Sequence, residues 1–138
     1  MEQDAQTGIP GLELAEASYQ RCCAVPEFYR HFYDNFLASD PRVPALFEGT
    51  EFAKQAKLLQ HAIGLMLIFA KRKNPVMLER IADRHGSRDL NVPEDLYPAF
   101  VDSFIETVKQ HDPEYADGLD DAWRAALEPG IRFMIQPH

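Results

Sequence analysis

Basic residues, cysteines and long apolar runs are all scarce in this chain of 138 residues. Its 14 lysines and arginines are outnumbered by 22 aspartates and glutamates, which gives a formal net charge of −8 at pH 7. Proteins that bind nucleic acid neutralise phosphates with clustered Lys and Arg, so this charge argues against a nucleic-acid partner. The most apolar run, residues 62–70, covers nine residues, far fewer than the roughly 20 of a membrane-spanning helix. We therefore expect no membrane partner.

The only two cysteines, Cys22 and Cys23, are adjacent. Neighbouring cysteines form a disulfide only with strain, and two cysteines do not make the scaffold of a secreted domain. Residues 1–6 are acidic and polar, whereas a signal peptide is basic and then apolar. We expect a cytoplasmic protein with two small, partly buried thiols, and a redox role for them is the alternative.

Helical periodicity dominates the rest of the sequence, and no run alternates apolar and polar residues as a half-buried strand would. The 46% hydrophobic and 26% charged composition is typical of a globular domain. We predict an all-α fold of six long helices and a short helical turn, with a flexible segment over 1–11 and a single domain over 12–138. The predicted helices cover 12–24, 26–38, 51–71, 75–86, 93–111 and 117–136, with the short turn ending at 46–47.

The longest predicted helix begins after Thr50, a plausible N-cap. Its apolar residues follow spacings of three and four, the pattern of a helix that faces a core. They are Leu59, Ala62, Ile63, Met66 and Ala70.

Histidine is the residue of this chain best suited to bind a metal. Imidazole uses one ring nitrogen as the ligand, while the other usually donates a hydrogen bond that fixes the ring. His31, His111 and His138 fall on polar, solvated or terminal positions, so only His61 and His85 lie near the predicted core. No pair of histidines has the spacing of a zinc site.

Among these candidates, His85 has the surroundings that favour a ligand. Ile81 lies four residues before it on the same helix face. Gly86 ends the helix and leaves room for a flat group, and Val92 and Tyr97 follow as apolar and aromatic lining. The alternative is an ordinary histidine at the end of a helix.

The longest helix would form the opposite wall. Gln55 and Leu59 are four residues apart and share a face, which Ile63 extends. An uncharged polar residue at one end of an apolar stripe suits a hydrogen bond to a small ligand; the alternative is that Gln55 is a surface residue. Tyr33 lies in an aromatic helix face, where a buried phenol needs a partner for its hydroxyl. That partner is either a ligand or a backbone carbonyl.

A series of short motifs runs along the chain in a fixed order. They are Phe32-Tyr33-Asp34-Asn35-Phe36-Leu37, Asp40-Pro41, Leu46-Phe47, Lys54-Gln55-Ala56-Lys57-Leu58-Leu59, Arg84-His85, Leu96-Tyr97-Pro98 and Asp121-Ala122-Trp123. Together they resemble a bacterial single-domain globin, closest in pattern to the haemoglobin domains related to flavohaemoglobins. The resemblance covers about residues 12–138.

The resemblance implies a globin fold that encloses haem b, with His85 as the proximal iron ligand. Tyr33 and Gln55 would be the polar residues on the distal side, where the gas binds. The residues lining the haem would be Phe47, Leu59, Ile63, Ile81, Val92 and Tyr97. The absence of a C-x-x-C-H motif excludes covalent attachment of the haem.

The sequence departs from the globin pattern before the distal helix. Only seven residues separate Phe47 from Gln55, so the small helix that usually precedes the distal helix is expected to be missing. A shift of one residue in register would place Lys54 or Ala56 over the iron, and Lys57 is a further candidate to hold the ligand.

A second departure concerns the proximal histidine. The family pairs it with a tyrosine, matched by Tyr97, and with a glutamate whose position falls at or near His138. Without that carboxylate His85 donates less electron density to iron, which weakens the case for peroxidase-like chemistry.

These features lead us to expect reversible binding of a diatomic gas, with O2 the leading ligand and NO and CO as others. The alternatives are a gas sensor that acts through a signalling partner, a nitric oxide dioxygenase that needs a separate reductase, and a haem-free helical interaction module. The sequence leaves the oligomeric state open, and a homodimer is one arrangement.

Overall fold

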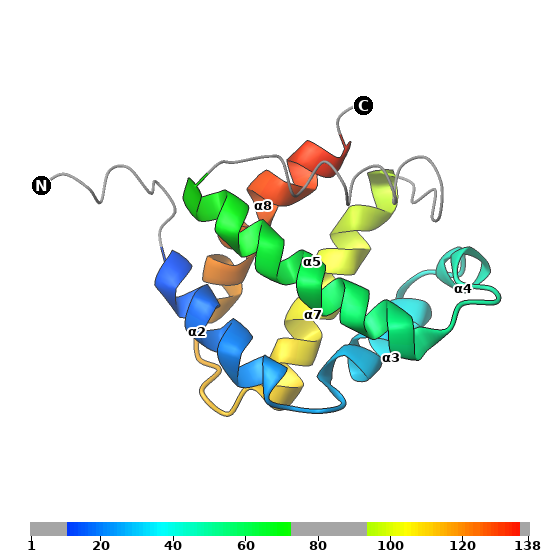
Figure 1. Ribbon diagram of the computed structural model, residues 1–138, viewed down its shortest axis with the longest axis horizontal. Helices are drawn as coiled ribbons and strands as arrows, with labels where there is room; N and C mark the ends of the chain where they lie inside the picture. The colour runs from blue at the N-terminus through cyan, green and yellow to red at the C-terminus, as the bar shows by residue number, and fades with distance from the viewer. Residues whose placement is uncertain (1–10, 73–93, 136–138) are drawn as a thin grey trace, which may run out of the picture.

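The computed structural model describes residues 11–72 and 94–135. Every regular element in these ranges is helical, as predicted (Figure 1). The elements are α2 (Leu12–Cys23), α3 (Phe28–Ser39), α4 (Val43–Leu46), α5 (Phe52–Arg72), the 3₁₀ helix η2 (Glu94–Leu96), α7 (Tyr97–His111) and α8 (Leu119–Ile135). The helix predicted over 75–86 lies outside the described residues. Within these residues, no helix is long and apolar enough to cross a membrane.

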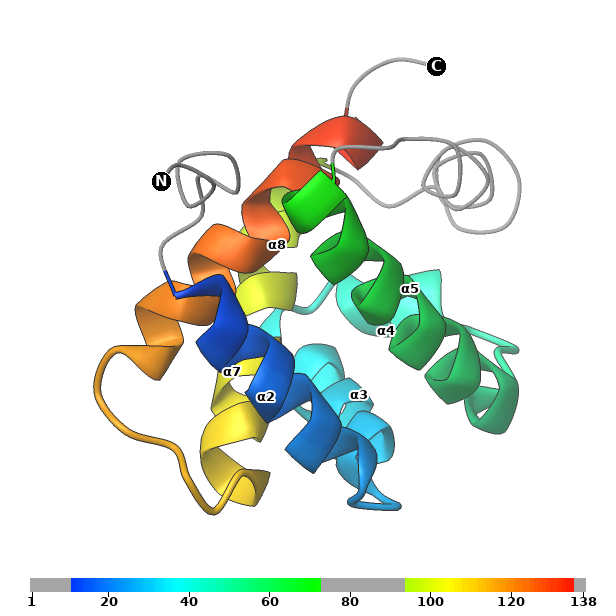
Figure 2. The same ribbon diagram turned by 60° about the vertical axis from the view of Figure 1, so that its left-hand side comes forward.

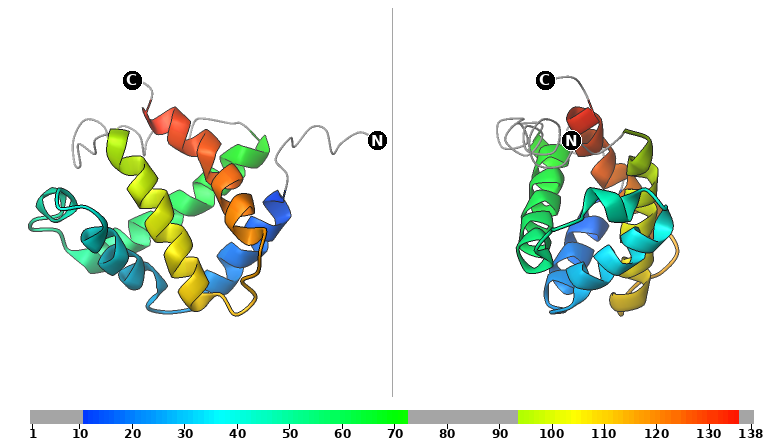
Figure 3. Two further views of the ribbon diagram at one scale, coloured as in Figure 1. Left: turned by 180° about the vertical axis from the view of Figure 1, so that it is seen from behind. Right: turned by 90° about the vertical axis from the view of Figure 1, so that its right-hand side faces the viewer.

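Helices α5 and α7 lie on opposite faces of the molecule. Helix α5 crosses in front of α7 in Figure 1, and the order is reversed when the molecule is seen from behind in Figure 3. Helices α2, α3 and α8 each pack against both of them. Figure 2 shows α2 between the ends of α8 and α3 on one side of this arrangement.

Three predicted helix starts were wrong by one or two residues. Helix α3 begins at Phe28 and not at Pro26, because the chain first makes a turn in which the Phe28 amide donates to the Val25 carbonyl at 3.1 Å. Helix α8 begins after Gly118, whose φ of 95° lies outside the right-handed helical region.

Thr50 is not the N-cap of α5. The amide of Gln55 donates to the carbonyl of Glu51 at 3.1 Å, so Glu51 occupies the N-cap position and the helix begins at Phe52. The amide of Thr50 instead closes a turn onto the Phe47 carbonyl at 3.0 Å. Residues 47–51 are thus a non-helical connection, and the predicted absence of a helix between α4 and α5 is confirmed.

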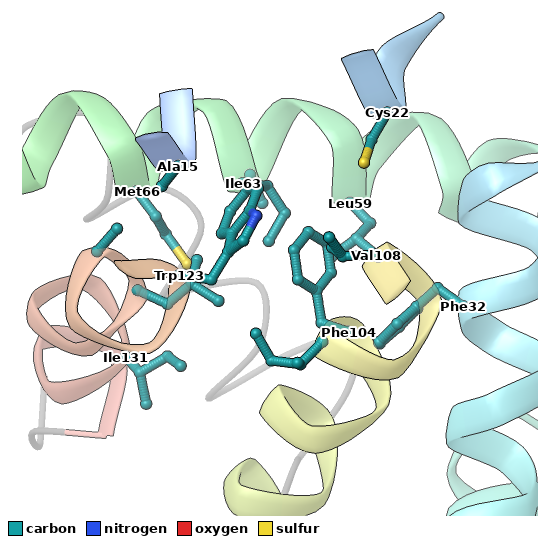
Figure 4. Packing of buried hydrophobic residues seen from close by; sticks show 14 of the residues in the cluster. Ala15, Cys22, Phe32, Leu59, Ile63, Met66, Phe104, Val108, Trp123 and Ile131 are labelled. Atoms are coloured by element: carbon teal, nitrogen blue, oxygen red, sulfur yellow. The ribbon is translucent and has the colours of Figure 1, made fainter. Parts of the chain in front are cut away.

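The core fills the space between α5 on one face and α7 on the other (Figure 4). The predicted stripe of α5 is buried along its length, with Leu59, Ala62, Ile63, Met66 and Ala70 all at most 5% exposed. Trp123 of α8 is fully buried and packs edge to face against Phe104 of α7, with ring centroids 4.8 Å apart. Burial of this apolar surface is the main stabilising contribution to the fold.

Glycine allows α5 and α8 to approach closely. A Cβ atom added to Gly130 would lie 2.7 Å from Met66 Cγ and 3.1 Å from Met66 Cβ. The two helices form one of the most extensive pairs in the described part of the molecule. A glycine inside a helix lowers the stability of that helix. Here Met66 packs into the space that a side chain at position 130 would fill, and this packing offsets the cost.

A buried carboxylate ties the ends of α2 and α7 to α8. The Asp112 side chain accepts hydrogen bonds from Arg21 Nε at 2.6 Å and from Ser18 Oγ at 2.6 Å. Ser18 Oγ in turn accepts from Trp123 Nε1 at 3.0 Å. Burial would raise the pKa of Asp112, but the hydrogen bonds from Arg21, Ser18 and the Glu114 amide outweigh it and lower that pKa.

The two cysteines are free thiols, as predicted, with Cys22 buried and Cys23 half-buried. Burial raises the pKa of Cys22 to about 12, so its reactive thiolate form is strongly disfavoured at neutral pH.

Candidate functional site

The residues predicted for the distal side of the site come from α3 and α5. Leu59 and Ile63 are buried on the inner face of α5, at 5% and 0% exposure. Gln55 is half-buried one turn before Leu59. The spacing of four residues therefore places an amide next to an apolar helix face, as the sequence predicted.

Tyr33 and Gln55 meet through their side chains. Tyr33 is 4% exposed on α3, and burial raises the pKa of its phenol, while a hydrogen bond with the Gln55 side chain acts in the opposite direction. The two side chains are therefore close enough to interact, and the effect of burial on this pKa is the larger of the two.

Two phenylalanines hold the Tyr33 ring in place. Its centroid lies 5.4 Å from that of Phe47 and 5.4 Å from that of Phe52, in a tilted or edge-to-face arrangement. Phe47 is 6% exposed and also packs against Phe36. Phe52 was not among the predicted site residues. It lies three residues before Gln55, so the two side chains are on neighbouring parts of one helix face.

A continuous chain of ring contacts links Tyr33 to Tyr97 at the start of α7. Tyr97 packs against Phe100, Phe100 against Phe36, and Phe36 against Phe47, with centroids 5.9 to 6.2 Å apart. Tyr97 is 8% exposed, and burial raises its pKa. The structure thus places both tyrosines along one aromatic wall.

Of the alternatives to Gln55, Lys54 extends into solvent, where its Nζ lies 3.6 Å from a Glu51 carboxylate oxygen. Ala56 and Lys57 line a cavity of about 540 Å³ between α3 and α5, and Tyr33 forms part of its wall. Among Lys54, Gln55, Ala56 and Lys57, all of which are described, Gln55 is the residue whose side chain affects the pKa of Tyr33.

The proximal half of the predicted site lies outside the described residues. This applies to His85, Ile81 and Val92, so their proposed roles are based on the sequence alone. His138 also lies outside the described ranges.

The remaining histidines divide into one isolated residue and one pair. His61 is exposed on α5, although the sequence placed it near the predicted core. His31 and His111 were expected to be separate solvated residues, but they are half-buried and their rings meet, with Nδ1 of His31 2.6 Å from Nε2 of His111. No local signal reveals a contact between residues 80 positions apart.

Comparison with known proteins gives one informative match. No protein-family model and no curated protein matches the chain. The crystal structure of a Pseudomonas aeruginosa PAO1 protein, described as structurally highly homologous to a human hemoglobin, matches with a TM-score of 0.84 and 30% identity. The match covers 90% of this chain and 95% of that one.

Proposed function

This chain belongs to the bacterial single-domain globins, and from that membership we propose that it binds haem b and reversibly holds a diatomic gas, with O2 as the leading ligand. The observation that carries the proposal is the pairing of Tyr33 with Gln55 beside the apolar face of α5. A bound haem would supply an iron centre to which a diatomic gas can bind.

The described residues fit a haem on its distal side. Leu59, Ile63 and Phe47 are buried apolar groups that suit contact with a porphyrin. The polar groups beside them, Tyr33 and Gln55, are uncharged. Apolar groups with a few polar ones beside them are the usual character of a cofactor site. Tyr97, expected on the side of His85, is also a buried ring.

The Tyr33 hydroxyl is the donor that would hold the gas. We propose that the phenol donates its proton to a polar ligand, with the Gln55 side chain beside it. Burial keeps the phenol protonated, so it remains a donor at neutral pH. Oxygen gains more from such a donor than carbon monoxide does, because it becomes more polar on binding.

We propose His85 as the axial ligand on the opposite side. The test is titration of the purified chain with haem, followed by absorption spectroscopy of wild type, His85→Ala and, as a matched control, His61→Ala. We expect a Soret band in wild type and His61→Ala that is shifted or lost in His85→Ala. A band that His85→Ala leaves unchanged would rule out this ligand, and no band in wild type would rule out haem binding.

A further inference from the structure

An imidazole pair joins α3 to the end of α7, and the proposed gas site does not use it. Nδ1 of His31 lies 2.6 Å from Nε2 of His111, and the ring centroids are 4.7 Å apart with planes inclined at 31°. Both side chains are half-buried. Two imidazole nitrogens from different helices therefore meet at a place that solvent can reach.

The surrounding contacts fix this pair. One turn along both helices, Asn35 Nδ2 donates to Thr107 Oγ1 at 2.9 Å. The His111 ring also packs edge to face against the buried Phe28, with centroids 6.0 Å apart. Helices α3 and α7 form the most extensive helix pair among the described residues. The imidazoles are thus held in position before any ligand arrives.

We propose that His31 and His111 form a two-imidazole site for a divalent transition metal that prefers tetragonal coordination, as Ni²⁺ and Cu²⁺ do. Imidazole suits these metals, and square-planar or tetragonal nitrogen sites are typical of them. Within residues 11–72 and 94–135, no third histidine, cysteine or carboxylate completes a cluster. Water would fill the other coordination positions, so the site is an exchangeable one.

The distance between the two nitrogens favours tetragonal metals over zinc. Metal–nitrogen bonds of about 2.0 Å hold two nitrogens about 2.8 Å apart at a right angle and about 3.3 Å apart at a tetrahedral angle. The observed separation is 2.6 Å. In either geometry each ring must turn so that its lone pair points at the metal and not at the other ring, but the right-angled pair changes the separation of the two nitrogens less than the tetrahedral geometry of Zn²⁺ does.

Metal binding replaces a hydrogen bond between the rings. Without metal, one facing nitrogen carries a proton and donates it to the lone pair of the other. When the metal binds, that proton moves through solvent to the outer nitrogen of the same ring, and both facing nitrogens donate lone pairs. Each ring stays neutral, no electron is transferred, and no proton is released from a neutral pair.

The test is calorimetric titration of the untagged full chain with NiCl2, which requires no haem and is independent of the proposed gas site. We expect one saturable Ni²⁺ site per chain in wild type, with Zn²⁺ bound more weakly. His31→Ala and His111→Ala should each raise the dissociation constant at least tenfold. His61→Ala removes an exposed imidazole from another helix and should leave binding unchanged.

His31→Gln and His111→Gln keep a polar side chain at each position and guard against loss of folding, which circular dichroism monitors. In folded variants, Ni²⁺ should raise the thermal midpoint of wild type but not that of either glutamine variant. Two results overturn the proposal: no saturable Ni²⁺ binding to wild type, or binding that persists in both histidine variants. Either result would leave His31 and His111 as a hydrogen-bonded pair that only joins two helices.

Discussion

At the scale of single residues, the arrangement of Tyr33 determines what the proposed site can do. Its ring is fixed by Phe47 and Phe52, and its hydroxyl interacts with the Gln55 side chain. A side chain held in this way loses little conformational freedom when its hydroxyl donates to a ligand. We therefore expect Gln55 to act on the gas mainly by orienting Tyr33.

We predict that Tyr33→Phe speeds O2 dissociation about fivefold, since one hydrogen bond contributes about 1 kcal/mol net. Gln55→Leu should speed it by a smaller factor, because the hydroxyl remains but loses its orienting partner. Stopped-flow displacement of O2 by CO in the haem-loaded protein measures both rates.

Tyr29→Phe is the matched control for these variants. Tyr29 is also buried on α3, but its hydroxyl lies beside Cys23 Sγ at 3.9 Å and not beside Gln55. Its removal should leave the O2 dissociation rate unchanged. Unaltered rates in both Tyr33→Phe and Gln55→Leu would mean that another residue holds the ligand.

The Asp112 carboxylate is the residue whose ionisation matters most for stability. We predict that Asp112→Asn destabilises the fold by about 3 kcal/mol at pH 7, since it breaks a buried, hydrogen-bonded ion pair. Breaking a buried ion pair costs about 3 to 5 kcal/mol. Arg21 is 26% exposed and can turn to solvent, so we expect a loss at the lower end of this range.

The pH dependence of this loss has a definite sign. The pKa of Asp112 is lower in the folded protein than in the unfolded chain, so its contribution is complete above the unfolded value and is lost as pH falls through the folded one. Urea unfolding of wild type and Asp112→Asn should therefore differ most near neutral pH and converge in acid. A difference that is constant with pH would show that the carboxylate charge is not involved.

At the scale of elements, the contact between α5 and α8 limits the size of the residue at position 130. We predict that Gly130→Ala lowers the free energy of unfolding by about 1 kcal/mol. Overpacking against Met66 costs about 1 to 3 kcal/mol, which outweighs the gain of about 1 kcal/mol from a better helix former. Thermal or urea unfolding measures the change.

Met66→Ala provides the control for this prediction. With the Met66 side chain shortened, the added methyl group of Gly130→Ala has space, so the same substitution should cost less or become stabilising in that background. Equal costs in both backgrounds would contradict the role given to this contact.

Sequence patterns predicted the elements well where the determinants are local. The burial of Leu59, Ile63 and Met66 follows from helical spacing, and the absence of a helix over 47–51 follows from the short connection. The N-cap of α5 was wrongly predicted at Thr50. Threonine is a preferred N-cap residue, but the Thr50 amide instead closes a turn onto Phe47.

Contacts between distant residues could not be predicted in the same way. The bonds of Asp112 to Ser18 and of His31 to His111 join residues 94 and 80 positions apart. They depend on how α2, α3 and α7 pack, which no local pattern encodes. The pairing of Tyr33 with Gln55 was anticipated only as two separate candidates for the distal side.

At the scale of the whole molecule, the predicted membership of the bacterial single-domain globins is confirmed. The matched structure covers 90% of the chain, so the helices that carry Tyr33, Gln55 and Tyr97 belong to one globin fold. The family therefore supplies the architecture, and the Tyr33–Gln55 pair is the part of it that we propose holds a ligand.

The most direct test of gas binding is the absorption spectrum of the haem-loaded ferrous protein before and after addition of CO. The account predicts that CO shifts the Soret band of the ferrous protein and that the shift reverses when CO is removed. It also predicts that the CO dissociation rate changes less in Tyr33→Phe than the O2 rate does. A ferrous spectrum that CO leaves unchanged would contradict the proposal that this globin reversibly binds a diatomic gas.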